Sequence, residues 1–337
     1  MSDALPGSEN RTVVVRAPTR IDFGGGWTDV PPYSSTVGGQ VCNVAIDLRA
    51  TVRLSTSRHD RPDHRAPASH LVGAALRHWD VRDATVELTS DFPVGAGLGG
   101  SSAAGVALAG ALAAWRGESP DRASLAEHSR TVEVEECGIA GGRQDHYAAA
   151  FGGALGLRFA AGGREDLVEV RRIPLDERTR RALETRCVLA YTGEARVSAA
   201  TIDAVLDAVR DGDARVTGTL GRMAEQAALM VDALEAGDVD ALGLLVGEQW
   251  TQQRSLHTAI TTPTIDRLLD AARRAGALGG KALGASGGGC VIAIAPADRA
   301  DAVREALADG AELLEFAIDE EGVTEGVGSR RSEAPGI

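Results

Sequence analysis

The segment Pro93-Val94-Gly95-Ala96-Gly97-Leu98-Gly99-Gly100-Ser101-Ser102-Ala103-Ala104 is the most informative part of this 337-residue sequence. Its glycines allow the backbone to approach a ligand closely. The Ala-rich residues 101–115 that follow predict a helix, with Ser101 at its start as the cap. A glycine turn that opens a helix presents free amides and the positive end of the helix dipole. The segment fits a phosphate-binding loop, but for one such loop taken alone an ordinary helix cap after a tight turn is the favoured interpretation.

Two better-known phosphate-binding motifs fit this sequence poorly. The glycines match G-x-G-x-x-G, but that fingerprint needs an acidic residue at the end of the next strand, about 20 residues on. Residues 118–121 at that distance form a loop between two predicted helices. A Walker A loop comes nearest at 276–281, where the spacing is short and Ala282 replaces the hydroxyl that would hold magnesium.

Outward from the loop, the pattern of apolar residues predicts an α+β protein in two halves. We expect strands at 12–15, 41–46, 50–55, 84–89, 154–159, 167–173, 290–294 and 312–318, and helices at 101–115, 125–136, 144–151, 265–275 and 297–307. Residues 197–246 are almost wholly helical in pattern. The predicted division is a strand-rich half at 11–185 and a helix-rich half at 186–325, with 1–10 and 326–337 as flexible tails.

Composition excludes several classes of protein. The 35 Lys and Arg residues against 48 Asp and Glu give a net charge of −13, which disfavours a nucleic-acid partner. No apolar run reaches the roughly 20 residues of a membrane span, and the polar start has no export signal, so we expect a cytoplasmic protein without a membrane partner. The 4 cysteines form no C-x-x-C pair, so neither a zinc ribbon nor a disulfide scaffold is predicted.

Three glycine clusters in this order resemble the three signature motifs of the GHMP small-molecule kinases. The first is Arg16-Ala17-Pro18-Thr19-Arg20-Ile21-Asp22-Phe23-Gly24-Gly25-Gly26-Trp27-Thr28-Asp29, the second is the segment quoted above, and the third is Lys281-Ala282-Leu283-Gly284-Ala285-Ser286-Gly287-Gly288-Gly289-Cys290. The resemblance implies a ribosomal protein S5 domain 2-like N-terminal domain and a ferredoxin-like, helix-rich C-terminal domain, with the active site in the cleft between them. Within the superfamily, residues 28–33 and 141–153 resemble the D-glycero-D-manno-heptose 7-phosphate kinases, whereas Gly25 to Asp29, with Asp22 upstream, is more similar to L-fucose kinases.

The resemblance implies a phosphotransferase that uses ATP and Mg²⁺. The residues expected at the ATP phosphates are Pro93, Gly95, Ala96, Gly97, Leu98, Gly99, Gly100, Ser101 and Ser102. Asp145 is the expected general base and Arg20 the stabiliser of the transferred charge. Ser102 and Glu135 are the expected Mg²⁺ ligands; the alternative is that Glu133, Glu135 and Glu136 form a solvated helix face.

The acceptor is expected to be a sugar, phosphorylated on its anomeric C1 hydroxyl. Asp29 would bind its hydroxyls, and the other expected contacts are Thr28, Gly25, Gly26, Trp27, Gln144, Tyr147, Gly287 and Gly288. Trp27 could instead be a core residue. Arg143 and Arg196 are candidates for a substrate phosphate. A heptose 7-phosphate is the first candidate acceptor, and the alternatives are L-fucose, an octose phosphate, or a non-catalytic sugar sensor. A monomer or a homodimer is expected.

Overall fold

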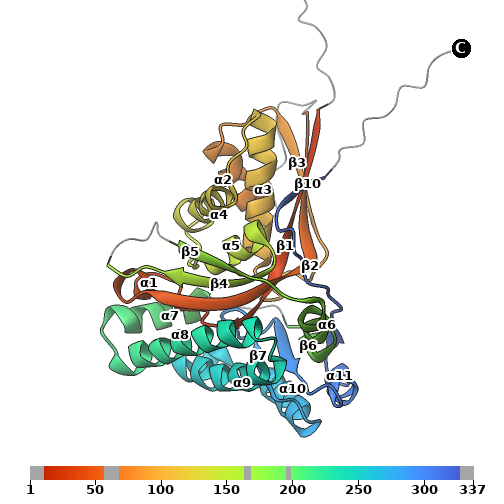
Figure 1. Ribbon diagram of the computed structural model, residues 1–337. Coiled ribbons are helices and arrows are strands. Elements are labelled where there is room, and N and C mark those ends of the chain that lie inside the picture. The colour runs from red at the N-terminus through yellow and green to blue at the C-terminus, as the bar shows by residue number, and fades with distance from the viewer. Residues whose placement is uncertain (1–10, 57–67, 163–167, 195–198, 327–337) are drawn as a thin grey trace, which may run out of the picture.

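The computed structural model describes residues 11–56, 68–162, 168–194 and 199–326, and folds them into two antiparallel sheets with helices packed against them (Figure 1). The larger sheet has the order β10-β1-β2-β4-β5, with β3 paired to β2 beside this path. Its strands are β1 (Thr12–Gly24), β2 (Gly39–Thr56), β3 (Ala84–Ser90), β4 (Ala154–Phe159), β5 (Val168–Ile173) and β10 (Thr324–Gly326).

Strands β1 and β2 are much longer than the sequence predicted. Pro18 was expected to end the first strand, but β1 continues to Gly24 through register shifts between Pro18 and Thr19 and between Asp22 and Gly24. A proline removes one donor from the ladder, and a bulge at that point lets pairing resume. The two strands predicted at 41–46 and 50–55 are one strand, whose first part pairs with β4 and whose second part pairs with β3.

Helices cover one face of the larger sheet (Figure 1). They are α2 (Ala68–His78), α3 (Gly100–Arg116), α4 (Arg122–Arg130) and α5 (Gln144–Phe151), and α4 runs directly into a π-helical turn at Thr131–Glu136. Helix α3 packs on β1 and β2, and its alanines are buried because small side chains allow close approach to the sheet. The single helix predicted at 125–136 is thus α4 plus the π turn, and α2 was not predicted.

The smaller sheet has the order β7-β8-β6-β9. Its strands are β6 (Cys187–Tyr191), β7 (Gly279–Ala282), β8 (Cys290–Ile294) and β9 (Glu312–Leu313), and its helices are α6 (Glu177–Arg186), α7 (Ala199–Arg210), α8 (Ala214–Glu235), α9 (Val239–Leu256), α10 (Pro263–Arg274) and α11 (Ala300–Ala308). A short helix, α1 (Tyr33–Thr36), follows β1. The predicted strand at 312–318 is therefore only β9, with a single bridge between Ile46 and Ile318.

One apolar cluster joins the two sheets and fixes the position of the motifs. It contains Ile21 and Phe23 of β1, Met230 of α8, Val246 of α9 and Ile292 of β8, all buried. Helix α8 lies against β1, β2 and β4 on one side and α9 on the other. Strand β1 carries the first glycine motif, and β7 and β8 flank the third. The shared core therefore brings these two motifs together.

The chain returns to the larger sheet near its end. Strand β10 pairs with β1, and Arg49 of β2 forms an ion pair with the buried Asp319. Residues 318–326 thus lie with the first half, although the sequence grouped 186–325 into the second. The predicted tails were 1–10 and 326–337; Gly326 belongs to β10, and residues 1–10 and 327–337 lie outside the described residues. Among the helices that the structure describes, none has the length and apolarity needed to cross a bilayer.

Candidate active site

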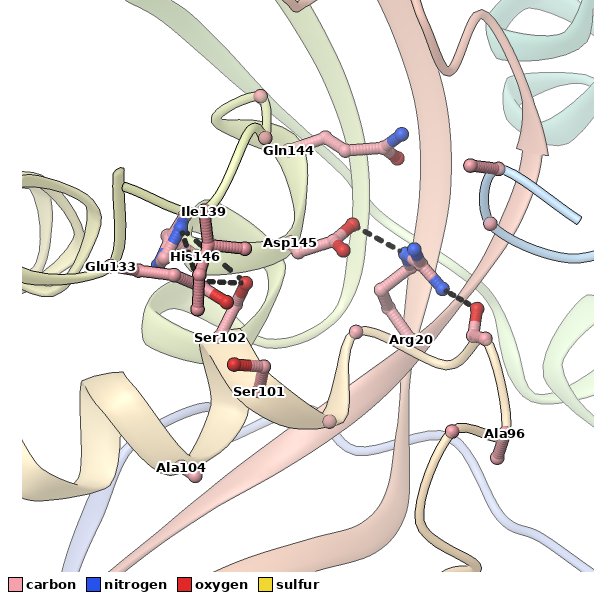
Figure 2. A pocket seen from close by; sticks show the side chains of 18 of the residues that line it. Arg20, Ala96, Ser101, Ser102, Ala104, Glu133, Ile139, Gln144, Asp145 and His146 are labelled. Carbon is pink, nitrogen blue, oxygen red and sulfur yellow. Dashed lines mark hydrogen bonds and ion pairs between the residues drawn. The ribbon is translucent and has the colours of Figure 1, made fainter. Parts of the chain in front are cut away.

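Parts of all three glycine motifs line one cleft of about 650 Å³ (Figure 2). Direct backbone contacts join them: the Cys290 N–H donates to Ala96 O at 2.8 Å, and the Arg20 N–H donates to Leu98 O at 3.0 Å. Gly97 has φ +76°, and a Cβ there would lie 2.7 Å from Leu283 O. Only glycine therefore fits where the second motif crosses the third.

The loop before α3 leaves the start of this helix open. Gly99, rather than Ser101, is the N-cap, with φ 74°, and no side chain caps the first turn. Ser101 was expected to cap the helix, and this expectation is wrong. Gly99, in the left-handed conformation, makes the turn, and Ser101 lies inside the helix. An uncapped helix start offers its amides and positive dipole to an anion. The geometry suits nucleotide phosphates.

Arg20 and Asp145 meet beside this loop (Figure 2). The Arg20 Nε–H donates to Asp145 Oδ1 at 2.7 Å, and an Nη1–H of Arg20 donates to Gly97 O at 2.7 Å. The Arg20 side chain is only 2% exposed, whereas that of Asp145 is 26% exposed, so Asp145 presents part of its carboxylate to the cleft. The arrangement places a proton acceptor and a fixed positive charge next to the predicted phosphate site.

A buried polar cluster lies behind the helix start. The Ser102 hydroxyl donates to Glu133 Oε2 at 3.0 Å, His146 Nε2 lies 3.1 Å from the same oxygen, and Ser129 Oγ lies 2.9 Å from His146 Nδ1. Burial raises the pKa of Glu133, but hydrogen bonds from His146, Ser101 and Ser102 and the charge of His146 outweigh it and lower that pKa overall. Glu133 therefore remains a carboxylate at neutral pH.

Glu135, the predicted metal ligand, does not line the described cleft. Its side chain is 60% exposed and pairs with Arg130 at 3.3 Å, whereas Glu133 lines the cleft. The π-helical turn accounts for the difference, because its wider spacing changes which glutamate faces inward. A carboxylate and a hydroxyl suit Mg²⁺, which usually takes its other ligands from phosphates and water. Among the described residues, no group of three or more acidic, His or Cys side chains could form a complete metal site.

Three carboxylates also line the cleft, those of Asp22, Asp29 and Asp145. Asp29 is buried and accepts the Gln144 N–H at 3.0 Å. Burial raises the pKa of Asp29 to about 6; the charges of Asp145 and Asp22 act in the same direction, and the Gln144 hydrogen bond opposes them. Acceptor oxygens of this kind are suited to polyol hydroxyls.

Trp27 also lines the cleft, and its backbone is in a strained conformation. Its φ is +80°, which is rare for a bulky side chain and costs about 1–3 kcal/mol. Trp27 is buried in the apolar cluster of the second half, as the core interpretation expects, and it also lines the cleft.

Several predicted substrate residues lie away from the cleft. Arg143 is buried and its Nε–H donates to Glu127 at 3.1 Å, and the Tyr147 hydroxyl donates to the same carboxylate at 2.9 Å. The Thr28 hydroxyl donates a hydrogen bond to Gly25 O at 2.6 Å. These side chains are occupied by internal partners and do not line the described cleft, and neither do Leu98, Gly25, Gly287 and Gly288. Arg196 lies outside the described residues.

The apolar wall of the cleft was missed by the sequence analysis. It includes His70 and Leu71 from α2, Leu88 from β3, and Phe92 and Val94 from the loop that follows. Val94 is 85% exposed. The sequence shows Val94 only as an apolar residue beside a glycine loop, and its exposure, which suits a nucleoside base, becomes visible in the structure.

Comparisons with known proteins agree with this geometry. The profile of the GHMP kinases N-terminal domain matches residues 68–153, and that of the GHMP kinases C-terminal domain matches residues 230–312. A galactokinase of Mycobacterium tuberculosis is 30% identical and covers 96% of this chain and 98% of its own length. The D-glycero-alpha-D-manno-heptose 7-phosphate kinase of Campylobacter jejuni is 26% identical and covers 93% of this chain and 98% of its own length.

A bifunctional relative and a solved structure extend the comparison. The L-fucokinase/L-fucose-1-P guanylyltransferase of Bacteroides fragilis is 27% identical over 83% of this chain, which spans only 34% of that longer protein. The crystal structure of a D-glycero-D-manno-heptose 1-phosphate kinase from Bacteroides thetaiotaomicron has the same fold, with a TM-score of 0.74 at 23% identity, over 93% of this chain and 98% of that one. The predicted two-domain α+β architecture is confirmed. With both family domains in order, and a relative at 30% identity along the full length, the chain belongs to the GHMP kinases.

Proposed function

We propose that this protein is an ATP-dependent sugar kinase in which Asp145 is the general base. The observation that carries the proposal is the Arg20–Asp145 pair beside the uncapped start of α3, within one cleft. A non-catalytic sugar sensor would have no need for a proton acceptor paired with a cation at the phosphate site. The relatives that match along their full length are named sugar kinases, which supports the same choice.

The proposed reaction is an in-line transfer of the γ-phosphoryl group. The sugar hydroxyl gives its proton to the Asp145 carboxylate as its oxygen forms a bond to the γ-phosphorus, and the bond from that phosphorus to the bridging oxygen of ADP breaks. Arg20 orients Asp145 through Oδ1 and places its positive charge near the transferred group. Asp145 then releases the proton to solvent.

Different groups of lining residues would bind the two substrates. The apolar wall with Leu71, Leu88 and Phe92 would take the nucleoside, and the loop at 95–102 would hold the phosphates. Glu133 and Ser102 would hold Mg²⁺, which neutralises phosphate charge when bound. The carboxylates that line the cleft, with Asp29 among them, would bind the sugar.

Two acceptor sugars are proposed, and in each the anomeric C1 hydroxyl receives the phosphoryl group. A heptose 7-phosphate is the first, because the Campylobacter jejuni relative matches along nearly all of both chains. L-Fucose is the second. Arg143 was expected to bind a sugar phosphate but is paired with Glu127. This favours an acceptor without a phosphate, such as L-fucose.

A coupled ADP-release assay over free and terminally phosphorylated hexoses, heptoses and octoses tests the proposal. One sugar should raise ADP release far above the rate with ATP alone, and ³¹P NMR should place the new phosphate on C1. If ATP binds but no sugar in the panel increases its turnover, the sugar kinase proposal is wrong. Turnover of the free sugar alone would select the second acceptor class over the first.

A further inference from the structure

We propose that Asp22, held in place by the buried Lys281, binds a hydroxyl of the acceptor sugar together with Gln144, and so helps to select the sugar. This inference rests on the proposed kinase function. Asp22 was not among the predicted site residues, yet it lines the cleft beside Gly26. The ligand group is a neutral hydroxyl, because it must lie among the carboxylates of Asp22, Asp29 and Asp145.

A buried ion pair fixes one side of Asp22. Lys281 Nζ donates to Asp22 Oδ2 and to the Asp22 backbone carbonyl, both at 3.0 Å. The two side chains are 0% and 2% exposed. Lys281 lies in β7 of the smaller sheet and Asp22 near the end of β1 of the larger sheet, so the pair bridges the two halves. Removing two charges from water is costly, so a buried pair is weak evidence of added stability, and we infer that this one orients Asp22.

Three buried polar atoms of residues that line the cleft are available to a ligand. Among the described residues, Asp22 Oδ1, Gln144 Oε1 and Trp27 Nε1 are buried without a hydrogen-bond partner. The side chains are 2%, 6% and 7% exposed, and all three residues line the cleft. Such atoms are rare in folded proteins because each costs about 1–3 kcal/mol. Two acceptors and one N–H donor match a sugar, whose hydroxyls both donate and accept.

The head groups of Asp22 and Gln144 both lie beside Gly26. A Cβ at position 26 would lie 2.6 Å from Asp22 Oδ2 and 2.8 Å from Gln144 Nε2. Figure 2 shows the Gln144 side chain extending from α5 toward β1, on the same side as Asp145. The charge of Asp22 also contributes to the raised pKa of Asp29, so these carboxylates are close enough to interact. A sugar that reaches Asp145 would therefore lie within reach of Asp22.

Lys281 acts as a positioning residue. Because its ammonium engages Oδ2, the carboxylate of Asp22 cannot rotate freely, and Oδ1 is the oxygen left for a ligand. Burial lowers the pKa of Lys281, and Asp22 opposes that shift. The third glycine motif would thus contribute to sugar selection through a residue that never touches the sugar.

Two variants with different structural consequences test the inference. Asp22→Ala/Lys281→Met removes both charges, which avoids leaving an unpaired buried lysine, and Asp22→Asn keeps an oxygen for Lys281 but loses the carboxylate. Both should raise KM for the sugar about 10- to 100-fold, as expected for a lost hydrogen bond to a charged group, with KM for ATP within twofold. Urea unfolding measures their stability, which should not track the change in KM.

Deoxy analogues of the best acceptor identify the hydroxyl. One analogue should have the same kcat/KM with the wild type and the double variant, because the interacting hydroxyl is already absent, whereas the other analogues keep the full loss. An equal loss on every analogue, or an unchanged sugar KM in the double variant, would overturn the proposal. If the wild type turns over no sugar, the kinase proposal fails. Calorimetric titration of the same sugars then still tests Asp22.

Discussion

Arg20 Nε lies 2.7 Å from Asp145 Oδ1, although 125 positions separate the two residues in the chain. Arg20 belongs to β1 and Asp145 to the first turn of α5, so the pair depends on the packing of that helix against the sheet. The second hydrogen bond of Arg20, to Gly97 O, ties the proposed base to the phosphate loop. The Arg20 guanidinium therefore fixes the distance between the Asp145 carboxylate and the phosphate loop, which act together in the proposed reaction.

Replacing Asp145 by Asn should lower kcat by about 10²- to 10⁴-fold, the usual contribution of a general base. An asparagine oxygen still accepts the Arg20 hydrogen bond, so the geometry of the pair is kept. KM for ATP should therefore change little, and steady-state kinetics with both substrates varied measures the difference. A kcat within threefold of the wild type would remove Asp145 from the role of base.

Glu133 and Glu135 form a matched pair of variants for the metal site. Glu133→Gln should raise the Mg²⁺ concentration needed for half-maximal rate by at least tenfold, on the order of one lost charged ligand. Glu135→Gln should leave it unchanged, because that side chain is mostly exposed and pairs with Arg130. The reverse pattern would restore the original sequence prediction.

Asp29 should make stability depend on pH. Its pKa is raised from 3.8 to about 6 in the folded protein. The stability that it contributes is fully present below pH 3.8 and is lost as pH rises through about 6, because the folded state then holds a desolvated charge. Asp29→Asn should therefore stabilise the protein at pH 8 by roughly 3 kcal/mol, since each unit is worth about 1.36 kcal/mol. Urea unfolding at pH 4 and pH 8 checks this, and the gain should nearly vanish at pH 4.

Arg143→Ala should affect stability and spare substrate binding. The side chain is buried against Glu127, which also receives the Tyr147 hydroxyl. Removing one partner of a buried pair costs about 3–5 kcal/mol, and the one-third exposure of Glu127 reduces this to about 1–3 kcal/mol. Urea unfolding should report that loss, with equal KM values for free and phosphorylated sugars before and after the change. A selective rise for the phosphorylated sugar would return Arg143 to the substrate site.

The sequence predicted what depends on local pattern. Strands at 154–159 and 290–294 and the helix at 144–151 match β4, β8 and α5 residue for residue, because periodicity and flanking glycines define them. The glycine motifs also indicated which loops would meet. These features need no knowledge of distant partners.

Side-chain roles that depend on tertiary contacts could not be predicted in this way. A normal α-helical register gave no reason to prefer Glu133 over Glu135, since the π turn arises from packing around Thr131–Glu136. Arg143 looked available because its partner Glu127 lies on a neighbouring helix. The apolar wall of the cleft was missed because its residues are typical of an ordinary core.

The pairing of β10 with β1 has a consequence for the order of synthesis. Strand β1 ends at Gly24 and β10 begins at Thr324, so at about 5–20 residues per second the first strand waits roughly 15–60 s for its neighbour to leave the ribosome. During that interval one edge of β1 is open to nascent chains nearby. The first half therefore emerges early but completes its sheet late, and release of residues 324–326 from the exit tunnel becomes a checkpoint for its assembly.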